Sequence, residues 1–179
     1  MDYFVMSQDK RIMNAPKLTF PSQVETPKHL DLNPYLGKML LINVKSSVLN
    51  EYPDYMEALV NFKAPVMFIS DKVKKIVSIY QRNITFQLAR LIERDRGHQE
   101  VYHVMDVPEV DCISESTVRD LGGNVKELIL DEEKIGVNRI FRVKGYEKRL
   151  IVRLDVAESL LRRDAAGICF EKVKVKEGL

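Results

Sequence analysis

The sequence predicts one α+β domain with a mixed, largely antiparallel sheet, two related strand-helix-strand units and an irregular Pro-rich N-terminal arm. Short apolar runs bounded by polar turns recur along the chain, which indicates strands. Two of these runs lead into segments with apolar residues at helical spacing, which indicates the two units. The prolines that remove backbone donors and predict the arm are Pro16, Pro21, Pro27 and Pro34.

The composition is that of a folded protein with a sizeable core. The chain has 179 residues, of which 45% are hydrophobic and 30% are charged. A domain of this size buries roughly 70% of the surface that its unfolded chain exposes, so we expect a single domain over residues 1–179. The formal net charge of +2 argues neither for nor against a nucleic-acid partner, because phosphate binding requires a concentrated basic face.

The N-terminal residues lack the pattern of a secretory signal, because the charges of Asp9, Lys10 and Arg11 follow closely and no long apolar stretch precedes them. No segment approaches the roughly 20 apolar residues of a membrane helix. We therefore expect a cytoplasmic protein without a membrane segment. In that reducing compartment Cys112 and Cys169 are expected to be free, buried thiols, with a disulfide between them as the alternative.

The first 50 residues are expected to hold strands and the arm. Residues 3–6 and 38–44 are apolar runs of strand length, and the arm lies between them. Residues 53–62 allow a short helix, because Pro53 suits a first helical turn.

In the first unit, residues 66–69 form a strand, and Ser70 or Asp71 caps the following helix through a side-chain oxygen. Asn83 suits the left-handed turn that ends this helix. Residues 84–88 then form a strand, with residues 101–105 as its hairpin partner. The apolar face of the helix comprises Val73, Ile76, Val77 and Tyr80.

The second unit follows strands at residues 125–130 and 139–143. Its own strand covers 150–152, its helix covers 155–166 and stops at Gly167, and a strand at 168–173 closes it. The helix residues expected to face inward are Ala157, Leu160 and Leu161.

The two units align without a gap, with residues 66–89 on 150–173, which indicates an internal repeat. Asp71 then falls on Asp155 and Asn83 on Gly167, so the caps and helix stops share one register. The alternative is that any two such units share this pattern because they share its physics.

The chain carries no recognisable catalytic, cofactor or metal motif. The histidines are His29, His98 and His103, and the last two are five residues apart, which is not the spacing of a helical zinc pair. Neither cysteine stands in a strained turn that would expose a nucleophile, and Gly122-Gly123 does not belong to a phosphate-binding loop. The run Asp131-Glu132-Glu133 could serve acid–base or metal chemistry, but adjacent turn residues point apart, which favours a solvated charge run.

Charge is distributed unevenly along the chain. Residues 106–133 hold nine acidic side chains against two basic ones, and residues 139–176 hold eleven basic side chains against five acidic ones. Either the two blocks neutralise each other across neighbouring strands, or they leave an acidic patch that attracts a basic partner protein. The candidate patch residues are Glu109, Asp111, Glu115, Asp131, Glu132 and Glu133. A nucleic-acid interpretation would instead use the basic block with its interspersed aromatic residues Phe141, Tyr146 and Phe170.

A family resemblance is carried by residues 125–135, 140–146 and 150–152 with the helix that follows, by residues 68–73, and by Tyr102 and Asp111. On these residues the chain resembles the immunity proteins of bacterial polymorphic toxin systems, a family first catalogued as a domain of unknown function. The resemblance covers roughly residues 54–173. Leu154 stands where that family often has a serine, so capping there falls to Asp155. The resemblance implies that the chain neutralises a toxin by binding it in the producing cell.

These features favour a non-enzymatic, protein-binding role without cofactor or metal, with a cognate toxin protein as the partner. The alternative is a small-molecule-binding protein, or an enzyme whose site is assembled from residues scattered along the sequence. Nucleic-acid binding ranks third, because Phe141 and Phe170 stand at positions better explained as core.

Overall fold

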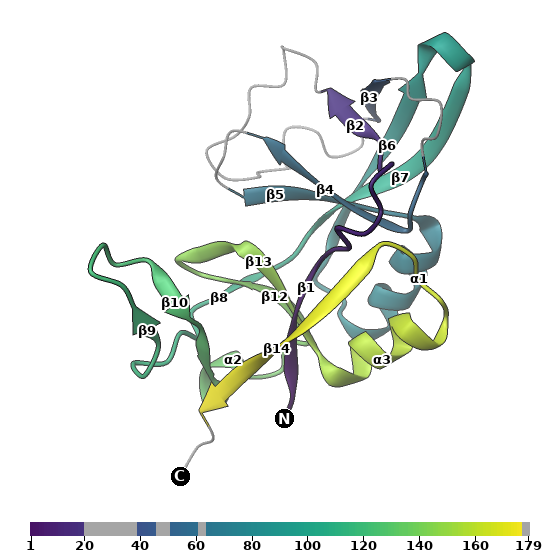
Figure 1. Cartoon of the computed structure of the whole chain (residues 1–179). Helices are drawn as coiled ribbons and strands as arrows, with labels where there is room; N and C mark the ends of the chain where they lie inside the picture. Colours follow the sequence, from purple (N-terminus) through teal and green to yellow (C-terminus); the bar gives the residue numbers. More distant parts are fainter. Residues whose placement is uncertain (20–38, 46–50, 61–63, 177–179) are drawn as a thin grey trace.

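The computed structural model describes residues 1–19, 39–45, 51–60 and 64–176. In these residues two six-stranded sheets, a two-stranded ribbon and three α-helices form a mixed α+β fold (Figure 1). Most strand pairs are antiparallel, and three pairs are parallel. The α+β class predicted from the sequence is confirmed, although the strands divide between two sheets.

The first sheet joins the N-terminal strand to the C-terminal third of the chain. Its order is β11-β14-β1-β13-β12-β8, so β1 lies at the centre between β13 and β14. Its strands are β1 (Tyr3–Gln8), β8 (Glu109–Val110), β11 (Ile129–Asp131), β12 (Ile140–Val143), β13 (Tyr146–Arg153) and β14 (Ile168–Lys176).

The second sheet is built from the middle of the chain, in the order β2-β3-β6-β7-β5-β4. Its strands are β2 (Lys17–Thr19), β3 (Leu40–Lys45), β4 (Tyr55–Val60), β5 (Ala64–Ile69), β6 (Thr85–Glu93) and β7 (His98–Asp106). The hairpin of β6 and β7 turns through the short 3₁₀ helix η2 (Arg94–Arg96) and Gly97, whose φ of 63° suits a glycine.

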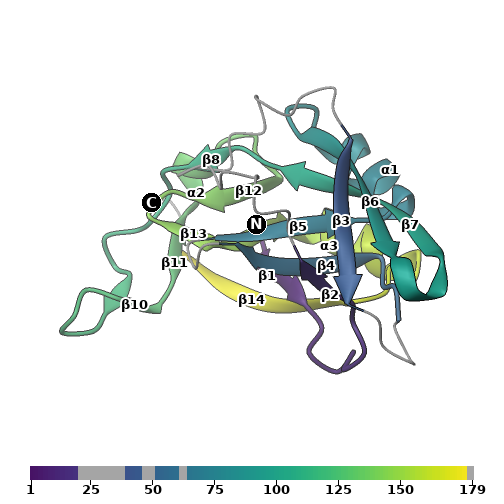
Figure 2. The ribbon, with the colours of Figure 1, turned by 90° about the horizontal axis from the view of Figure 1, so that it is seen from above.

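Two helices pack against each other beside the two sheets (Figures 1 and 2). Helix α1 (Asp71–Tyr80) begins where the sequence predicts, because the Ser70 side chain accepts a hydrogen bond from the Val73 backbone N–H. Helix α3 (Leu154–Arg162) follows β13 directly. The third helix, α2 (Glu132–Ile135), is a single turn after β11.

Apolar residues from both sheets and both long helices form one shared core. It includes Tyr55, Ile69, Val73, Ile76 and Val77 from the middle of the chain, and Met6, Ile140, Val152, Val156 and Leu160 from the first sheet and α3. Two further clusters cover the other faces of the sheets. Burial of this continuous apolar surface holds the two halves together.

Five strands of each sheet share one arrangement. The order β3-β6-β7-β5-β4 matches β11-β14-β1-β13-β12, with the same parallel and antiparallel pairing at each step. In each half the strands on either side of a helix flank a central antiparallel strand. That central strand is the hairpin partner β7 in one half, and the N-terminal strand β1 in the other.

The structure differs from the sequence-based register in the second helix. Helix α3 starts one residue earlier than the alignment of Asp71 with Asp155 requires, because its N-cap is Arg153, the last residue of β13. Arg153 makes no side-chain capping hydrogen bond, and Asp155 lies inside the first turn and does not cap the helix as expected. Its buried face is therefore Val156, Ala157, Ser159 and Leu160. Leu161, expected inward, is 59% exposed.

Three other local predictions are wrong. Residues 53–62 do not form a helix: Tyr55–Val60 is β4, whose antiparallel pairing with β5 overrides the local helical pattern. Asn83 is not left-handed, because α1 already ends at Gln81, whose backbone is extended with φ −143°. Gly167 does have a positive φ of 86°, but α3 ends at Arg162, so this glycine serves the turn into β14.

The structure describes only one proline of the predicted arm, Pro16. It stands directly before β2, a strand that was not predicted from the sequence. Pro21, Pro27 and Pro34 lie outside the described residues. The strand expected over 125–130 divides into β10 (Val125–Glu127) and β11.

Within the described part of the chain, every helix is too short or too polar to cross a membrane.

Candidate functional site

The predicted acidic patch lies where two chain segments run side by side in the first sheet. The Asp131 N–H donates to the Cys112 carbonyl at 2.8 Å, and the Ser114 N–H donates to the Ile129 carbonyl at 2.9 Å. These bonds bring Asp111 and Glu115 next to the strand that ends in Asp131. Strand β8, which carries Glu109, pairs with β12 at the end of the sheet order opposite to β11. The chain that leaves β8 then reaches β11 through the bond at Cys112.

Two of the six candidate carboxylates are engaged in ion pairs. Glu132 lies 2.9 Å from the N-terminal ammonium of Met1. Asp131 lies 3.5 Å from the ammonium of Lys134, within α2. Both carboxylates are half-buried, and these pairs leave less of their charge available to a partner molecule.

The other four, Glu109, Asp111, Glu115 and Glu133, are exposed. Among the described residues none of them has an ion-pair partner within 4.0 Å. We name these four residues the acidic edge. Their charges are not neutralised by a close partner and therefore contribute to the field that an approaching molecule meets.

The acidic and basic blocks of the sequence neutralise each other at one described ion pair, between Glu127 and Lys174 at 2.7 Å. Arg142 is removed from the surface instead: it is 5% exposed, and it donates to the Pro65 carbonyl at 2.7 Å. Burial lowers the pKa of this guanidinium, against the opposing effect of Asp106 and other nearby acids.

A two-stranded ribbon stands beside the acidic edge. It consists of β9 (Val118–Arg119) and β10, which pair with each other and with neither six-stranded sheet (Figure 1). Its turn is closed by Asp120, whose side chain accepts from the backbone N–H groups of Gly122 and Asn124 at 2.9 Å each. This ribbon was not predicted from the sequence, although Asp, Gly, Gly and Asn within five residues are typical of a tight turn.

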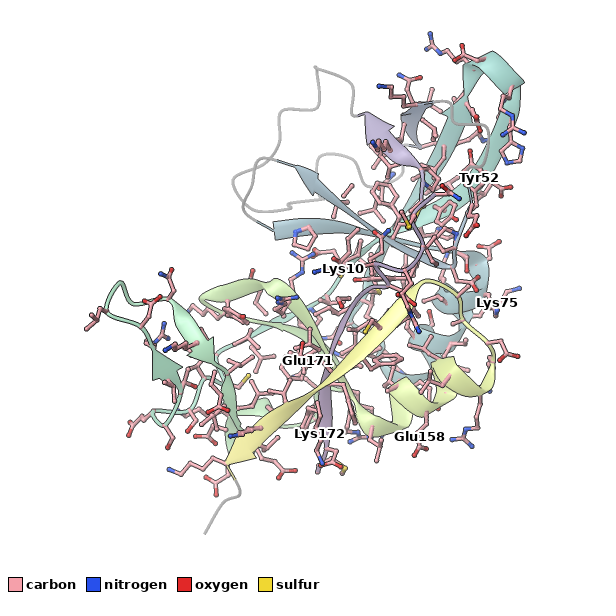
Figure 3. The ribbon with its side chains drawn as sticks, viewed as in Figure 1. Lys10, Tyr52, Lys75, Glu158, Glu171 and Lys172 are labelled. Atoms are coloured by element: carbon pink, nitrogen blue, oxygen red, sulfur yellow. The ribbon has the colours of Figure 1, made fainter. Side chains whose placement is uncertain are left out.

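A groove of about 680 Å³ lies between the N-terminus, the start of the ribbon and β14. Ile129, Val173 and Val175 give it apolar lining. The ammonium of Lys172, which is labelled in Figure 3, is 3.0 Å from Asp2, and Lys174 is paired with Glu127, so two lysines of the groove already have acidic partners.

The histidines do not form a joint site. His29 lies outside the described residues. His98 pairs with Glu100 at 3.0 Å, and its ring lies 5.0 Å from that of Tyr52. His103 is five residues further along β7, so it points to the opposite face, toward α1.

His103 and Asp71 have the geometry of a catalytic His–Asp pair, with 2.7 Å between Nε2 and Oδ1. The carboxylate can only accept, so Nε2 donates, and this hydrogen bond lowers the pKa of Asp71. The other ring nitrogen faces the Lys74 ammonium at 3.4 Å and must accept from it. Nδ1, the ring nitrogen that would have to accept a proton from a nucleophile, is therefore already engaged by Lys74. The cluster instead links the start of α1 to β7.

Both cysteines are free. Cys112 is fully buried as expected, and burial raises the pKa of its thiol to about 11. Cys169 is exposed, which corrects the expectation of two buried thiols: its side chain alternates outward along β14. Across the described ranges no three His, Cys, Asp or Glu side chains gather closely enough to hold a metal ion.

The three aromatic residues of the nucleic-acid interpretation face inward. Phe141 is fully buried, Phe170 packs against the shared core, and Tyr146 packs against the cluster on the other face of the first sheet. They do not offer the exposed ring faces on which bases stack.

No family model matches the chain, and no curated protein matches it.

Proposed function

We propose that the chain is a non-enzymatic protein-binding domain, an immunity protein that neutralises a bacterial toxin by direct binding in the cytoplasm of the producing cell. The observation that carries the proposal is the acidic edge: four exposed carboxylates, unpaired among the described residues, in a chain whose net charge is +2. The resemblance over residues 54–173 supplies the class of partner.

Unpaired surface charge of one sign acts mainly on association. Complementary potentials orient two proteins before contact and exclude partners of the wrong charge. Such fields reach about 8–10 Å at physiological salt, well beyond a hydrogen bond. The partner that this edge would favour is a protein with a basic surface, which is a common property of toxins that act on nucleic acids.

We also infer that the two strand-helix-strand units, residues 66–89 and 150–173, are related. Their support is the strand arrangement common to both sheets and the contact between α1 and α3. Relatedness would give the domain two similar halves around one core, with the acidic edge and the ribbon added to the second half. A rigid core of this kind suits a protein that binds with a preformed surface.

The test is to co-express the chain with the toxin domain encoded beside its gene, and to measure survival and complex formation by the purified proteins. Protection together with a stable one-to-one complex is expected. Absence of an adjacent toxin, or of a complex between the purified proteins, would remove the immunity role. Turnover of the toxin's substrate by the chain itself would favour the enzyme alternative.

A further inference from the structure

The ribbon of β9 and β10 projects from the body of the domain (Figures 1 and 2). An isolated two-stranded hairpin is only marginally stable in water, so a projecting one must be held by other bonds. At its base, the Thr117 hydroxyl donates to the Ile129 carbonyl at 2.9 Å and accepts from the Ile129 N–H at 3.2 Å. The ribbon is thereby fixed to β11, the strand that leads into Asp131 and Glu132.

The tip of the ribbon is held as firmly as its base. Besides the two bonds to the Asp120 carboxylate, the Asp120 N–H donates to the Asn124 carbonyl at 2.9 Å, and Arg119 donates to the Gly123 carbonyl at 3.0 Å. The side-chain hydrogen bond from Asn124 lowers the pKa of Asp120, so the carboxylate stays charged in its accepting role. Gly123 supplies the positive φ of 80° that the turn requires.

This well-held turn presents a leucine to water. Leu121 is fully exposed, at 111% of its reference area, and Val118 nearby is 44% exposed. A large apolar side chain on a preordered tip loses little conformational entropy when a partner covers it. Apolar anchors of this kind, seated in a pocket and surrounded by charged rims, carry much of the energy of protein interfaces.

We infer that this ribbon is the anchoring element of the toxin complex, with Leu121 seated in an apolar recess of a basic toxin surface. The inference rests on the proposed function and names its contact. The charge beside the ribbon indicates the occupant: Asp111 and Glu115 of the acidic edge lie in the segment that leads into β9, ten and six residues before Leu121 in the sequence. The acidic edge accelerates the encounter, and the leucine slows dissociation.

The test compares two neutral substitutions in the full chain against the purified toxin domain encoded beside its gene. Leu121→Ser removes the anchor, and Met13→Ser removes an equally exposed apolar side chain, 90% accessible, from a loop outside the ribbon. Dissociation of the Leu121→Ser complex should be about 10- to 100-fold faster, with a nearly unchanged association rate. The Met13→Ser complex should dissociate at the wild-type rate. The Leu121→Met complex should keep most of the wild-type lifetime, because methionine is also a large apolar side chain.

Each outcome decides the matter. Equal lifetimes for wild type and Leu121→Ser, or equal weakening by Leu121→Ser and Met13→Ser, would overturn the role of the ribbon and leave the immunity role standing. If the wild-type chain itself forms no complex with the toxin domain, the proposed function and this inference fall together.

Discussion

Gly167 lies against Pro53, so closely that a Cβ built on the glycine would stand 2.6 Å from the Cβ of the proline. The same added atom would stand 2.7 Å from the Tyr55 carbonyl oxygen. The Gly167 carbonyl in turn accepts from the Asp9 N–H at 2.9 Å. Three distant segments therefore meet at one residue that must lack a side chain and must adopt a positive φ.

Gly167→Ala is expected to destabilise the fold by about 3 kcal/mol or more, because the strain of the left-handed backbone adds to the steric overlap. The matched control is Gly145→Ala, whose φ of 78° is similar but whose added Cβ would meet open space. It should cost about 1 kcal/mol. Urea unfolding of both variants measures the difference, and equal losses would mean that the contact with Pro53 is not tight.

Neighbouring leucines in α3 test the observed register of that helix. Leu160 is fully buried, so Leu160→Ala should lower the free energy of unfolding by about 2–5 kcal/mol. Leu161 is 59% exposed, so Leu161→Ala should change it by less than about 0.5 kcal/mol. Thermal or urea unfolding decides, and a larger loss at Leu161 would restore the register predicted from the sequence.

The two thiols should react very differently. With a pKa of about 11, roughly one Cys112 in a thousand is a thiolate at pH 8, and its burial also blocks access. Cys169 is exposed. Mass spectrometry after iodoacetamide treatment should find one labelled thiol in the native protein and two in denaturant. Rapid labelling of Cys112 in the native protein would contradict the packing of the first sheet.

Asp54 connects the start of β4 to α1 and to the turn between α3 and β14. Its carboxylate accepts from Ser70 Oγ at 2.6 Å, Lys72 Nζ at 3.0 Å and the Ala166 N–H at 2.9 Å. Burial pushes the pKa of Asp54 upward, but these hydrogen bonds outweigh it and lower the pKa. The stability that the charged form contributes is therefore present above the unfolded pKa near 3.8 and is lost as the pH falls through the folded pKa.

Asp54→Asn should accordingly cost about 2 kcal/mol at pH 7, because the charged acceptor of three donors is lost. The difference from wild type should shrink as the pH is lowered below about 4, where the wild-type carboxylate also becomes neutral. Urea unfolding at several pH values measures this, with Glu171→Gln, an exposed carboxylate on β14, as the control. A difference that stays constant down to pH 2 would contradict the assignment.

Features determined by neighbouring residues could be predicted from the sequence. Helix α1 was predicted with Ser70 or Asp71 as its cap and with Val73, Ile76 and Val77 on its apolar face, because cap and periodicity lie within one segment. Strand β4 was not, because its pairing with β5 is a tertiary interaction. The position of β1 at the centre of the first sheet depends on pairing between Tyr3 and Arg153, which no local pattern encodes.

In the candidate site, too, local features could be predicted from the sequence and tertiary ones could not. Its acidic composition was visible in the sequence, and all six carboxylates were named. Which of them remain unpaired was not visible, because Glu132 is neutralised by the N-terminus, 131 residues away in the chain. The exposure of Leu121 likewise depends on how the ribbon stands relative to the first sheet, and that follows from the bonds of Thr117 to Ile129.

The most direct test of the account is the association rate with the neighbouring toxin domain at two salt concentrations. The reversed variant changes Glu109, Asp111 and Glu115 to Lys. The control changes Asp95, Glu158 and Glu171 to Lys, which gives the same net charge away from the acidic edge; Glu158 and Glu171 lie on α3 and β14 (Figure 3). Unfolding of both variants in urea confirms that the fold is intact.

For the wild type, raising the salt from about 50 to 500 mM should slow association roughly tenfold or more and leave dissociation nearly unchanged, because screening acts on the encounter. The reversed variant should associate slowly at both concentrations, and the control should follow the wild type. If the reversed variant protects cells fully and associates at the wild-type rate, independent of salt, the acidic edge is not the steering surface. If the wild-type chain forms no complex with the toxin domain, the immunity role itself is contradicted.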